Sequence, residues 1–567
     1  MSSLGSFVWS IADQLRGVYK PHQYGGVILP FTILRRLDCI LEPTRDDVRA
    51  LAQKHDGGAL DVKVRQQTGF RFYNTSEYNF AKLLAEPDQL RSNLVDYISR
   101  FSANIDVFER FKFENEVATL DEKHRLYLVV SKFAEVDLHP ATVSNAEMGD
   151  LFEELIRKFA EASNEEAGEH YTPRDAIRLM VDLLYAEENL ALLEPGVVRS
   201  IYDPTAGTGG MLSVAEERLL ERNPRARLAL YGQEINDQSY AICKSDMIAK
   251  GQDASNVQLA DTLADDRFAG RTFDFCLSNP PYGVDWKASQ ETVKAEAAEF
   301  PRGRFGHGLP SVSDGQMLFL THLAHKLRPA HEGGGRAGIV LNGSPLFNGA
   351  AGSGPSEIRR WLLESDLVDA IVALPTNMFF NTGIATYIWI LDTSKADERK
   401  GKVQLIDART FWTKLRKNLG AKSREVGAED RERIVELYDD FSEAEHSKIF
   451  NIADFGYWNI TIERPLLDDG GQMVTDAKGL PKPDPKLRDT ENVPFTYSGG
   501  NEAYLKAEVL PHVPDAWIAE KKTKLGYEIP FARHFYKYVP PRPLADIDAD
   551  LEAQVARILG LLREVEG

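Results

Sequence analysis

Apolar residues recur at helical spacing through the first 165 residues of the chain. Side chains three or four positions apart share one face of a helix, and two series follow this rule. They are Phe7, Ile11, Leu15, Val18 and Leu90, Leu94, Tyr97, Ile98, Phe101. We expect Asp88 to be the N-cap of the second helix. Ser144 and Glu147 have the spacing of a capping box at the start of a later helix. Residues 1–165 are therefore predicted to form a helical domain.

From about residue 168 the pattern changes to short apolar runs that alternate with helix-length segments. The runs cover residues 200–202, 228–232, 257–260, 273–278, 338–341, 367–374 and 385–391. The helical segments between them are 211–221, 237–250, 315–327 and 357–363. Strands separated by crossover helices are typical of a mostly parallel, doubly wound sheet. The seven runs predict one large α/β domain over residues 166–395.

The remaining region, residues 396–567, has a less regular pattern. Residues 399–424 are locally basic, and residues 463–500 are rich in Pro, Gly and Asp, which is typical of loops. The chain closes on a helix whose apolar residues step by four and three positions: Leu551, Val555, Ile558, Leu562 and Val565. This is heptad spacing over only two heptads. It fits a terminal helix packed on its own domain and a helix that docks on a partner equally well.

Composition and charge narrow the class of protein. The 567 residues carry 67 Lys and Arg against 86 Asp and Glu, a formal charge of -19, which argues against a protein that coats nucleic acid through net charge alone. The widely spaced Cys39, Cys243 and Cys276 exclude a disulfide framework and a Cys-based zinc module, and we predict no metal site. No basic residue precedes Arg16, and no apolar run reaches the roughly 18 residues of a membrane span. We expect a cytoplasmic protein without membrane contact.

A glycine-rich loop follows the first predicted strand. It reads Asp-Pro-Thr-Ala-Gly-Thr-Gly-Gly from Asp203 to Gly210 and leads into a helix. Glycines let the backbone approach a ligand, and the helix start presents free N–H groups. A nicotinamide-binding loop would need Gly-x-Gly-x-x-Gly, but Leu212 stands at the third glycine position. The leading Asp203 would repel a pyrophosphate, whereas it suits a ligand that carries an ammonium group.

Carboxylates follow the next two predicted strands. Glu234 ends the second strand, where it could accept two hydrogen bonds from a ribose diol at the sheet crevice. Taken alone, a strand-end carboxylate in solvent would be the preferred interpretation, but the preceding glycine loop favours the ribose. Asp261 follows the third run and could accept from an adenine amino group or cap a helix. The residues themselves leave both interpretations of Asp261 open.

The sequence Asn-Pro-Pro-Tyr occupies positions 279–282, at the end of the fourth predicted strand. The two prolines fix the backbone so that the Asn279 side-chain carbonyl and the Pro280 main-chain carbonyl can converge on one point. Two acceptors at one point suit an amino group, and Tyr282 offers a face on which a planar base or amide can stack. A structural Asn-Pro turn is the alternative. The position after Asp203 and Glu234 favours a site that binds an amino group.

With these residues the chain resembles the S-adenosylmethionine-dependent amino-methyltransferases, whose catalytic signature is Asn-Pro-Pro-Tyr. It is most similar to the modification (methyltransferase) subunit of Type I restriction-modification systems. The resemblance covers most of the chain, including Trp9 and residues 31–37, 168–174, 375–383, 464–466 and 541–562. It implies a Rossmann-like methyltransferase domain with a seven-stranded, mostly parallel sheet. This domain would lie between an N-terminal helical domain and a C-terminal mixed region that ends in a helix.

The resemblance also implies a role for each matching residue. Asn279, Pro280 and Tyr282 would bind a flipped adenine of double-stranded DNA, and Phe379 would pack on its other face, with Phe380 as second choice. The residues implied in binding the cofactor S-adenosyl-L-methionine are Glu169, His170, Tyr171, Thr172, Pro173, Arg174, Asp203, Thr205, Ala206, Gly207, Gly209, Glu234 and Asp261. The reaction implied is methyl transfer to the exocyclic N6 amino group of that adenine.

The family pattern implies partners as well. A separate specificity subunit would choose the DNA site, two copies of this chain would grip the duplex beside it, and a restriction subunit would join some assemblies. The sequence has no Gly-x-x-x-x-Gly-Lys-Ser/Thr loop, so we expect no ATP-driven translocation from this chain. The alternatives are a stand-alone DNA adenine methyltransferase, a protein-glutamine or RNA methyltransferase, a non-catalytic DNA-complex scaffold and, more distantly, an NAD-dependent oxidoreductase. If DNA is bound, residues 399–424 and the pair Arg302 and Arg304 are the candidate basic surfaces, with a solvated face as the alternative for both.

Overall fold

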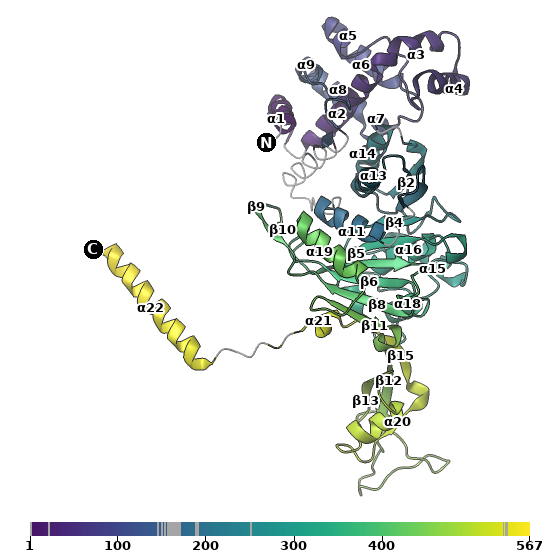
Figure 1. The fold of residues 1–567 in the computed structure, drawn as a ribbon, viewed down its shortest axis with the longest axis vertical. Helices are drawn as coiled ribbons and strands as arrows, with labels where there is room; N and C mark the ends of the chain where they lie inside the picture. The colour runs from purple at the N-terminus through teal and green to yellow at the C-terminus, as the bar shows by residue number, and fades with distance from the viewer. Residues whose placement is uncertain are drawn as a thin grey trace. The chain divides into compact units, whose positions relative to one another are not determined.

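The computed structural model describes most of the chain. The residues that it does not describe are 1–2, 21–22, 145–146, 149–150, 152–154, 156–171, 187–191, 250–251, 381, 537, 539–542 and 567. Contacts divide the chain into two units, Met1–Ile529 and Pro530–Gly567. The first unit contains the helical N-terminal region, the central sheet and a smaller β region (Figure 1).

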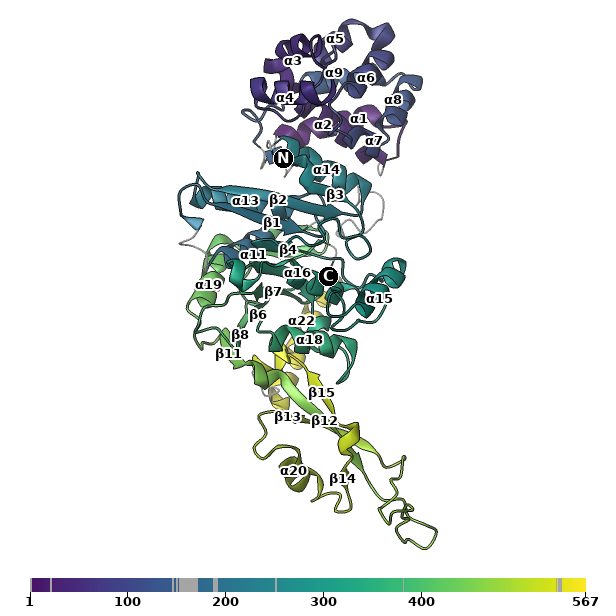
Figure 2. The ribbon, with the colours of Figure 1, turned by 90° about the vertical axis from the view of Figure 1, so that its right-hand side faces the viewer.

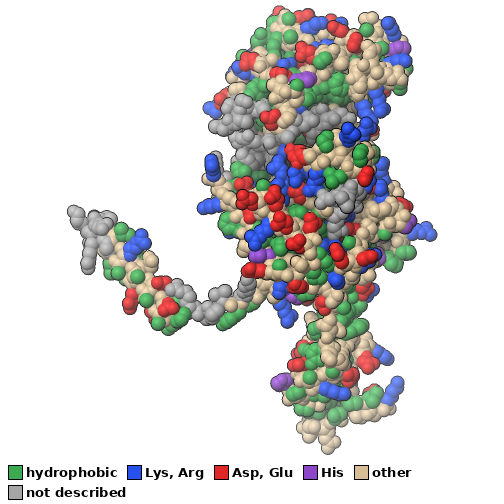
Figure 3. Space-filling view, in the orientation of Figure 1, with side chains coloured by type: hydrophobic (Ala, Val, Ile, Leu, Met, Phe, Trp, Pro, Cys, Tyr) green, Lys and Arg blue, Asp and Glu red, His purple; other side chains and the backbone are tan. Residues whose placement is uncertain are grey.

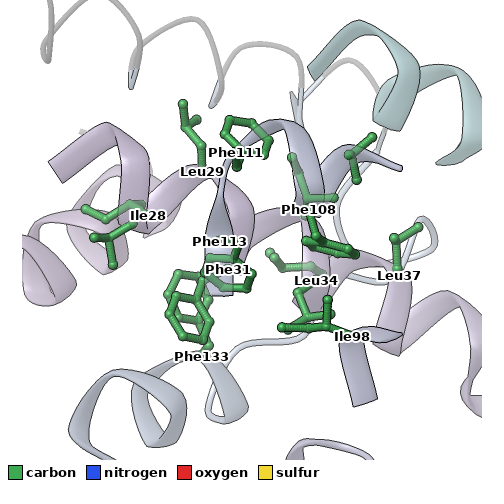
Figure 4. Packing of buried hydrophobic residues seen from close by; sticks show 14 of the residues in the cluster. Ile28, Leu29, Phe31, Leu34, Leu37, Ile98, Phe108, Phe111, Phe113 and Phe133 are labelled. Carbon is green, nitrogen blue, oxygen red and sulfur yellow. The ribbon is translucent and has the colours of Figure 1, made fainter. Parts of the chain in front are cut away.

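The N-terminal region is helical, as predicted. Its α-helices are α1 (Ser3–Leu15), α2 (Tyr24–Leu41), α3 (Arg45–Ala52), α4 (Gly57–Thr68), α5 (Phe80–Ala85), α6 (Leu90–Ser99), α7 (Val107–Arg110), α8 (Phe113–Glu122) and α9 (Leu126–Ala134). The apolar face of α2 lies at the centre of their core, where the Phe31 ring meets Phe113 edge-on at 4.7 Å and stacks on Phe133 at 5.3 Å (Figure 4). Burial of this apolar surface is what holds the short helices together.

Local details of this region differ from the prediction at two points. Helix α1 ends at Leu15, so Val18 lies in the turn after it. Helix α6 begins at Leu90 with Gln89 as N-cap, because the preceding residues form a short 3-10 turn that contains Asp88. The predicted capping box is present: the Glu147 N–H donates to Ser144 Oγ at 3.2 Å, and the Ser144 N–H donates to Glu147 Oε2 at 2.9 Å.

A large sheet forms the centre of the first unit (Figures 1 and 2). The strands are β1 (Val198–Asp203), β2 (Arg227–Glu234), β3 (Val257–Leu259), β4 (Phe275–Ser278), β5 (Arg336–Asn342), β6 (Val368–Ala373), β7 (Thr386–Asp392), β8 (Lys402–Asp407) and β11 (Ser447–Asn451). Their order in space is β11-β8-β6-β7-β5-β4-β1-β2-β3. Neighbours pair in parallel except where β7 meets β5 and β6 and where β11 meets β8. The predicted α/β class with a mostly parallel sheet is thus confirmed.

The seven predicted strands are all present as β1 to β7, but the described sheet has nine strands. The count of seven was too low because β8 lies within the basic segment 399–424, where charged residues hide its Val403, Leu405 and Ile406. Strand β11 is short and only partly buried, and it pairs at the edge of the sheet. The sheet continues to Asn451, beyond residue 395, where the sequence pattern divided the chain. The domain boundary itself stays a prediction.

Helices precede, separate or follow the strands of the sheet, and most of them pack on it. They are α11 (Arg174–Ala186), α13 (Gly210–Arg222), α14 (Asp237–Ala249), α15 (Gln290–Ala298), α16 (Gln316–Lys326), α17 (Ser344–Phe347), α18 (Gly354–Glu364) and α19 (Ala428–Asp439). Helix α14 also packs on the N-terminal helices, since Ala241 and Ile242 belong to their apolar core. Lys244 donates to Asp106 at 2.6 Å across the same contact.

The rest of the first unit is built from short strands. A separate hairpin consists of β9 (Thr413–Leu419) and β10 (Lys422–Glu425). A further sheet contains β12 (Gly456–Glu463), β13 (Asp489–Pro494), β14 (Trp517–Ile518) and β15 (Lys524–Tyr527), followed along the chain from β13 by α20 (Gly500–Tyr504). The prediction that residues 463–500 are loops was wrong for β13, whose one buried residue, Val493, leaves little strand pattern to read.

The second unit contains α21 (Phe531–His534) and α22 (Leu544–Glu566). The predicted terminal helix is therefore present as α22, and Leu551, Val555 and Ile558 are each more than half exposed (57%, 52% and 56%). Among the described residues, no helix is both long and apolar enough to cross a membrane.

Candidate active site

The predicted site residues gather where several parallel strands end at one edge of the sheet. Asp203 is the last residue of β1, Glu234 is the last residue of β2, and Asn279 directly follows β4. A crevice at the carboxyl ends of parallel strands is where ligands bind in open α/β sheets. Here the crevice is a cavity of about 330 Å³. The predicted residues that line it are Thr172, Asp203, Thr205, Ala206, Gly207, Glu234, Asp261 and Asn279.

The glycine loop curls against the end of β2. The Gly207 N–H donates to Glu234 Oε2 at 2.7 Å, and the Asn236 N–H donates to the other carboxylate oxygen at 2.8 Å. Gly209 has a φ of +82°, and a Cβ at this position would lie 2.9 Å from Cys243 Sγ on α14. Only glycine fits this conformation and this approach. Gly209 therefore shapes the loop from behind, and it does not line the cavity.

Asp203 is buried with one of its two oxygens unused. Its Oδ1 accepts from the Thr205 N–H at 2.9 Å and from Thr205 Oγ1 at 3.2 Å. Its Oδ2 has no hydrogen-bond partner among the described residues. Burial raises the pKa of Asp203 from 3.8 to about 7, and the neighbouring Glu234 adds to the shift. A buried carboxylate oxygen without a donor, in a residue that lines a cavity, fits a cationic N–H group of a ligand.

Asp261 is held by the turn that follows β3. Its Oδ1 accepts from the Leu263 N–H at 2.9 Å, and its Oδ2 accepts from the Ser289 hydroxyl. These bonds are those of a residue that caps a turn, which was one of the two interpretations of the sequence. The residue also lines the cavity, so contact with a ligand stays a prediction.

Asn279 is oriented by two side chains. Its Nδ2 donates to Thr172 Oγ1 at 2.8 Å, and its Oδ1 accepts from the Tyr282 hydroxyl at 2.6 Å. Burial raises the pKa of Tyr282 far above its ordinary value, so the phenol stays a donor. The Asn279 amide is therefore held at both ends, by Thr172 on its amino side and by the Tyr282 hydroxyl on its carbonyl side. Thr172 was predicted to hold the cofactor; it lines the cavity and also positions Asn279.

The two aromatic residues predicted to hold the base do not form a slot in this structure. The Phe379 and Tyr282 rings meet edge-on, with 6.3 Å between their centroids and an angle of 86° between their planes. Phe379 is only 2% exposed and belongs to the core of the sheet domain, whereas Phe380 is half-buried. A base stacked between two parallel rings would require one ring to turn, so the role of Phe379 stays a prediction.

The other predicted residues do not line the cavity. They are Pro173, Arg174, Gly209, Pro280, Tyr282 and Phe379. Glu169, His170 and Tyr171 lie outside the described residues.

Several apolar residues that were not predicted as site residues also line the cavity, among them Ile235, Trp286 and Phe319. Ile235, directly after Glu234, is 67% exposed, and the side chains of Trp286 and Phe319 line other parts of the cavity. Ile235 could have been predicted as a site residue, because it directly follows Glu234, which was predicted to bind the ribose. Nothing in the local pattern distinguishes Trp286 or Phe319 from ordinary core residues.

The candidate basic residue Arg304 is an internal residue. It is 8% exposed, donates to both oxygens of Glu296 at 2.7 and 2.6 Å, and lies 2.9 Å from His322. It is therefore not available as basic surface.

The structure defines an α/β protein with a cavity at the carboxyl ends of its parallel strands, and comparisons with known proteins lead to a methyltransferase family. The chain belongs to the N-6 DNA methylase family, whose model matches residues 143–462. A model of the HsdM N-terminal domain matches residues 4–133.

The relatives agree with this assignment. The Type I restriction enzyme MjaIX methylase subunit of Methanocaldococcus jannaschii is 25% identical over 79% of this chain and 79% of its own length. Other methylase subunits of this kind match over little more than half of their length, for example 57% for MjaVII. The methyltransferase subunit of a type I restriction-modification system from Streptococcus thermophilus shares the fold, with a TM-score of 0.62, 24% identity, and coverage of 80% of this chain and 96% of its own. A structure described as showing complex assembly of the type I R-M system matches all of this chain and 98% of its own, with a TM-score of 0.51 and 18% identity.

Proposed function

We propose that this chain is the modification subunit of a Type I restriction-modification system, and that it transfers a methyl group from S-adenosyl-L-methionine to the N6 amino group of adenine in DNA. The observation that carries the proposal is the Asn279 amide, held by Thr172 at the end of β4, beside a cavity lined by Asp203, whose Oδ2 has no hydrogen-bond partner among the described residues. Membership of the N-6 DNA methylase family supports the choice of reaction.

The cavity residues fit the cofactor. Asp203 Oδ2 would accept from the ammonium group of its methionine end, and Glu234 would accept from the ribose hydroxyls. Asp261 would face the adenine ring, and Ile235 offers an apolar surface beside it. When bound, the cofactor supplies an electrophilic methyl group on a sulfonium.

The target base would be recognised by the residues that follow β4. The N6 amino group is out of reach within a stacked duplex, so the adenine must be flipped out at a cost of a few kcal/mol. Stacking on Tyr282 would return about 1–3 kcal/mol of this cost. The amino group would donate to the Asn279 side-chain oxygen in place of the Tyr282 hydroxyl, and to the Pro280 carbonyl.

These two acceptors would also prepare the amino group for reaction. They favour a more tetrahedral nitrogen and hold its lone pair in line with the methyl group. No general base is needed before attack, because the cationic product loses its proton more readily than the neutral amine. Most of the catalysis would then come from positioning and electrostatics.

The proposal includes partners. A specificity subunit would select the site on double-stranded DNA, two copies of this chain would flank it, and a restriction subunit would join in some assemblies. The match over the whole chain to a structure concerned with assembly of a type I system supports this. We propose a cytoplasmic location, and α22, with its exposed apolar residues, as the helix that docks on the specificity subunit.

The test is methyl transfer by Asn279→Ala. We expect S-adenosylhomocysteine binding by calorimetry to be retained, whereas transfer of radiolabelled methyl groups to DNA falls by about 100-fold or more. Asn115→Ala, at an exposed position on α8, is the matched control and should be fully active. Co-purification with neighbouring gene products, followed by sequencing that maps methylated adenines, identifies the partners and the site. Near-normal turnover by Asn279→Ala would refute the assignment.

A further inference from the structure

The basic residues of segment 399–424 are of two kinds: some form ion pairs with carboxylates, and others are exposed to solvent. Arg399 and Arg409 form ion pairs, and Lys422 is buried with a carboxylate beside it. The partners of these three residues are Asp369, Asp407 and Asp175, at N–O distances of 2.8, 2.6 and 2.9 Å. Lys414 and Arg416, in contrast, are exposed on β9. Neither forms an ion pair with any residue that the structure describes.

Lys414 and Arg416 lie two positions apart on β9, and both side chains are exposed. Arg416 falls between Lys414 and Leu419, where the register of β9 against β10 shifts. Arg424 is the cross-strand neighbour of Lys414 and lies over the Trp412 ring at 4.0 Å. No Asp or Glu occurs between positions 408 and 424. Lys and Arg side chains are visible in Figure 3 at the place where Figure 1 draws β9 and β10.

The turn of the hairpin is pressed against the loop that carries Phe379. The Ala421 N–H donates to the Phe380 carbonyl at 2.9 Å, and the Ser423 N–H donates to the Asn377 carbonyl at 3.0 Å. Gly420, with a φ of +61°, completes the turn, and a Cβ there would lie 2.6 Å from the Phe380 oxygen. The hairpin and the loop are therefore held together through their main chains.

Lys422, directly after the turn of the hairpin, is bonded to the same end of the site. Its ammonium donates to both oxygens of Asp175 at 2.9 Å and to the Met378 carbonyl at 3.0 Å. Asp175 lies in the first turn of α11, three residues after Thr172, which orients Asn279. The hairpin is thus bonded directly to the start of α11 and to the loop that carries Phe379. Both segments lie at the end of the site where the target base is proposed to bind.

We propose that the β9–β10 hairpin is an arm that grips the DNA backbone beside the flipped adenine, with Lys414 and Arg416 on phosphates. This inference rests on the proposed function, since it names the surface by which that site holds its substrate. The chain as a whole carries a charge of -19, so a polyanion must be bound by a local positive surface. Lys414 and Arg416 provide two such exposed cations. The next helix, α19, carries Glu429, Asp430 and Glu432, so the duplex would approach from the side of the hairpin and not over α19.

The test is the salt dependence of duplex binding by the full chain, together with the subunits that co-purify with it. The probe is a fluorescein-labelled duplex of about 30 base pairs, titrated at several salt concentrations. In K414A/R416A the slope of log K against log salt should become shallower by about 1.8, because two phosphate contacts are lost, and affinity near 0.1 M salt should fall by more than about tenfold. S-adenosylhomocysteine binding should stay at the wild-type value.

Lys63 and Arg65 on the exposed face of α4 provide the matched control. K63A/R65A removes the same charge at the same spacing and should keep the wild-type slope. The charge-preserving K414R/R416K should restore binding, which separates loss of charge from loss of folding. A wild-type slope in K414A/R416A, or an equal loss in K63A/R65A, would overturn the arm.

Other outcomes distinguish this inference from the function on which it rests. If K414A/R416A binds DNA normally but loses a co-purifying subunit, the hairpin contacts an acidic protein surface and the DNA arm is wrong. If Asn279→Ala is inactive while the hairpin variants bind and methylate normally, only the arm fails. If Asn279→Ala is fully active, or the wild-type assembly binds no duplex, the proposed function fails as well.

Discussion

Binding of the cofactor should release a proton from Asp203 below neutral pH. In the ligand-free protein, burial raises the pKa of this carboxyl from 3.8 to about 7. At about 1.36 kcal/mol per pKa unit, the shift represents a cost of about 4 kcal/mol for the charged form in the empty cavity. An ammonium group against Asp203 Oδ2 would remove much of that cost, so the bound state would favour the carboxylate. If the pKa of Asp203 in the complex falls below about 4, the affinity for the cofactor should drop about 25-fold between pH 7.5 and pH 5.5.

Calorimetry with S-adenosylhomocysteine measures this directly. Titrations at about pH 6 in two buffers of different ionisation enthalpy give the number of protons released, which should approach one. Asp203→Asn should bind more weakly at pH 7.5 and lose the pH dependence in this window. Asp47→Asn, on the exposed side of α3, should behave as the wild type.

Stability should depend on pH in the opposite sense to that of a salt-bridged carboxylate. The folded-state pKa of Asp203 lies above the unfolded value, so its contribution is fully present below about pH 4 and is lost as pH rises through 7. The difference in unfolding free energy between wild type and Asp203→Asn isolates this contribution from other carboxylates. Absence of proton release at pH 6, or the same pH profile in Asp203→Asn, would refute the reasoning.

Three further predictions concern positioning, base capture and assembly. Thr172→Val removes the acceptor for Asn279 Nδ2 at nearly constant size, so single-turnover methylation should fall about tenfold and return in Thr172→Ser; full activity of the valine variant would contradict the positioning role. Tyr282→Ala should weaken capture of the flipped base by about tenfold or more without changing S-adenosylhomocysteine affinity, as followed with a 2-aminopurine probe at the target position. Loss of cofactor binding alone would be evidence against this role. Deletion of residues 544–567, which contain α22, should release the specificity subunit in gel filtration. An unchanged complex would rule out the docking role.

Sequence patterns predicted the parts of the fold that depend on local burial. Strands β5, β6 and β7 are nearly all buried, so they stand out as apolar runs. Strands β8 and β13 were not predicted, because neither has a clear apolar pattern. Charged residues flank β8, and β13 exposes nearly all its side chains, so both depend on pairing with neighbouring strands. Burial by tertiary neighbours outweighs local propensity at such positions.

The site shows the same division. Asp203, Glu234 and Asn279 could be placed because each ends or follows a strand of one parallel sheet, and such ends meet at one edge. The hydrogen bond between Thr172 and Asn279 joins residues 107 positions apart, and no local pattern encodes it. Phe379 was chosen over Phe380 by resemblance alone, yet their burial differs because the loop turns Phe379 into the core.

Helix α14 belongs to two hydrophobic cores at once, and this couples the N-terminal helices to the sheet domain. Tyr240 and Cys243 on one side belong to the core of the sheet domain, while Ala241, Ile242 and Ile248 on the other belong to the N-terminal core. Its first residue comes three positions after Glu234, and Cys243 supports the glycine loop from behind. Cutting the chain between the two regions would expose Ala241, Ile242 and Ile248 to water, so the sheet domain should be less stable without the N-terminal helices. Because α14 packs on both regions and begins just after the end of β2, it connects the N-terminal helices to the edge of the cavity that Glu234 lines.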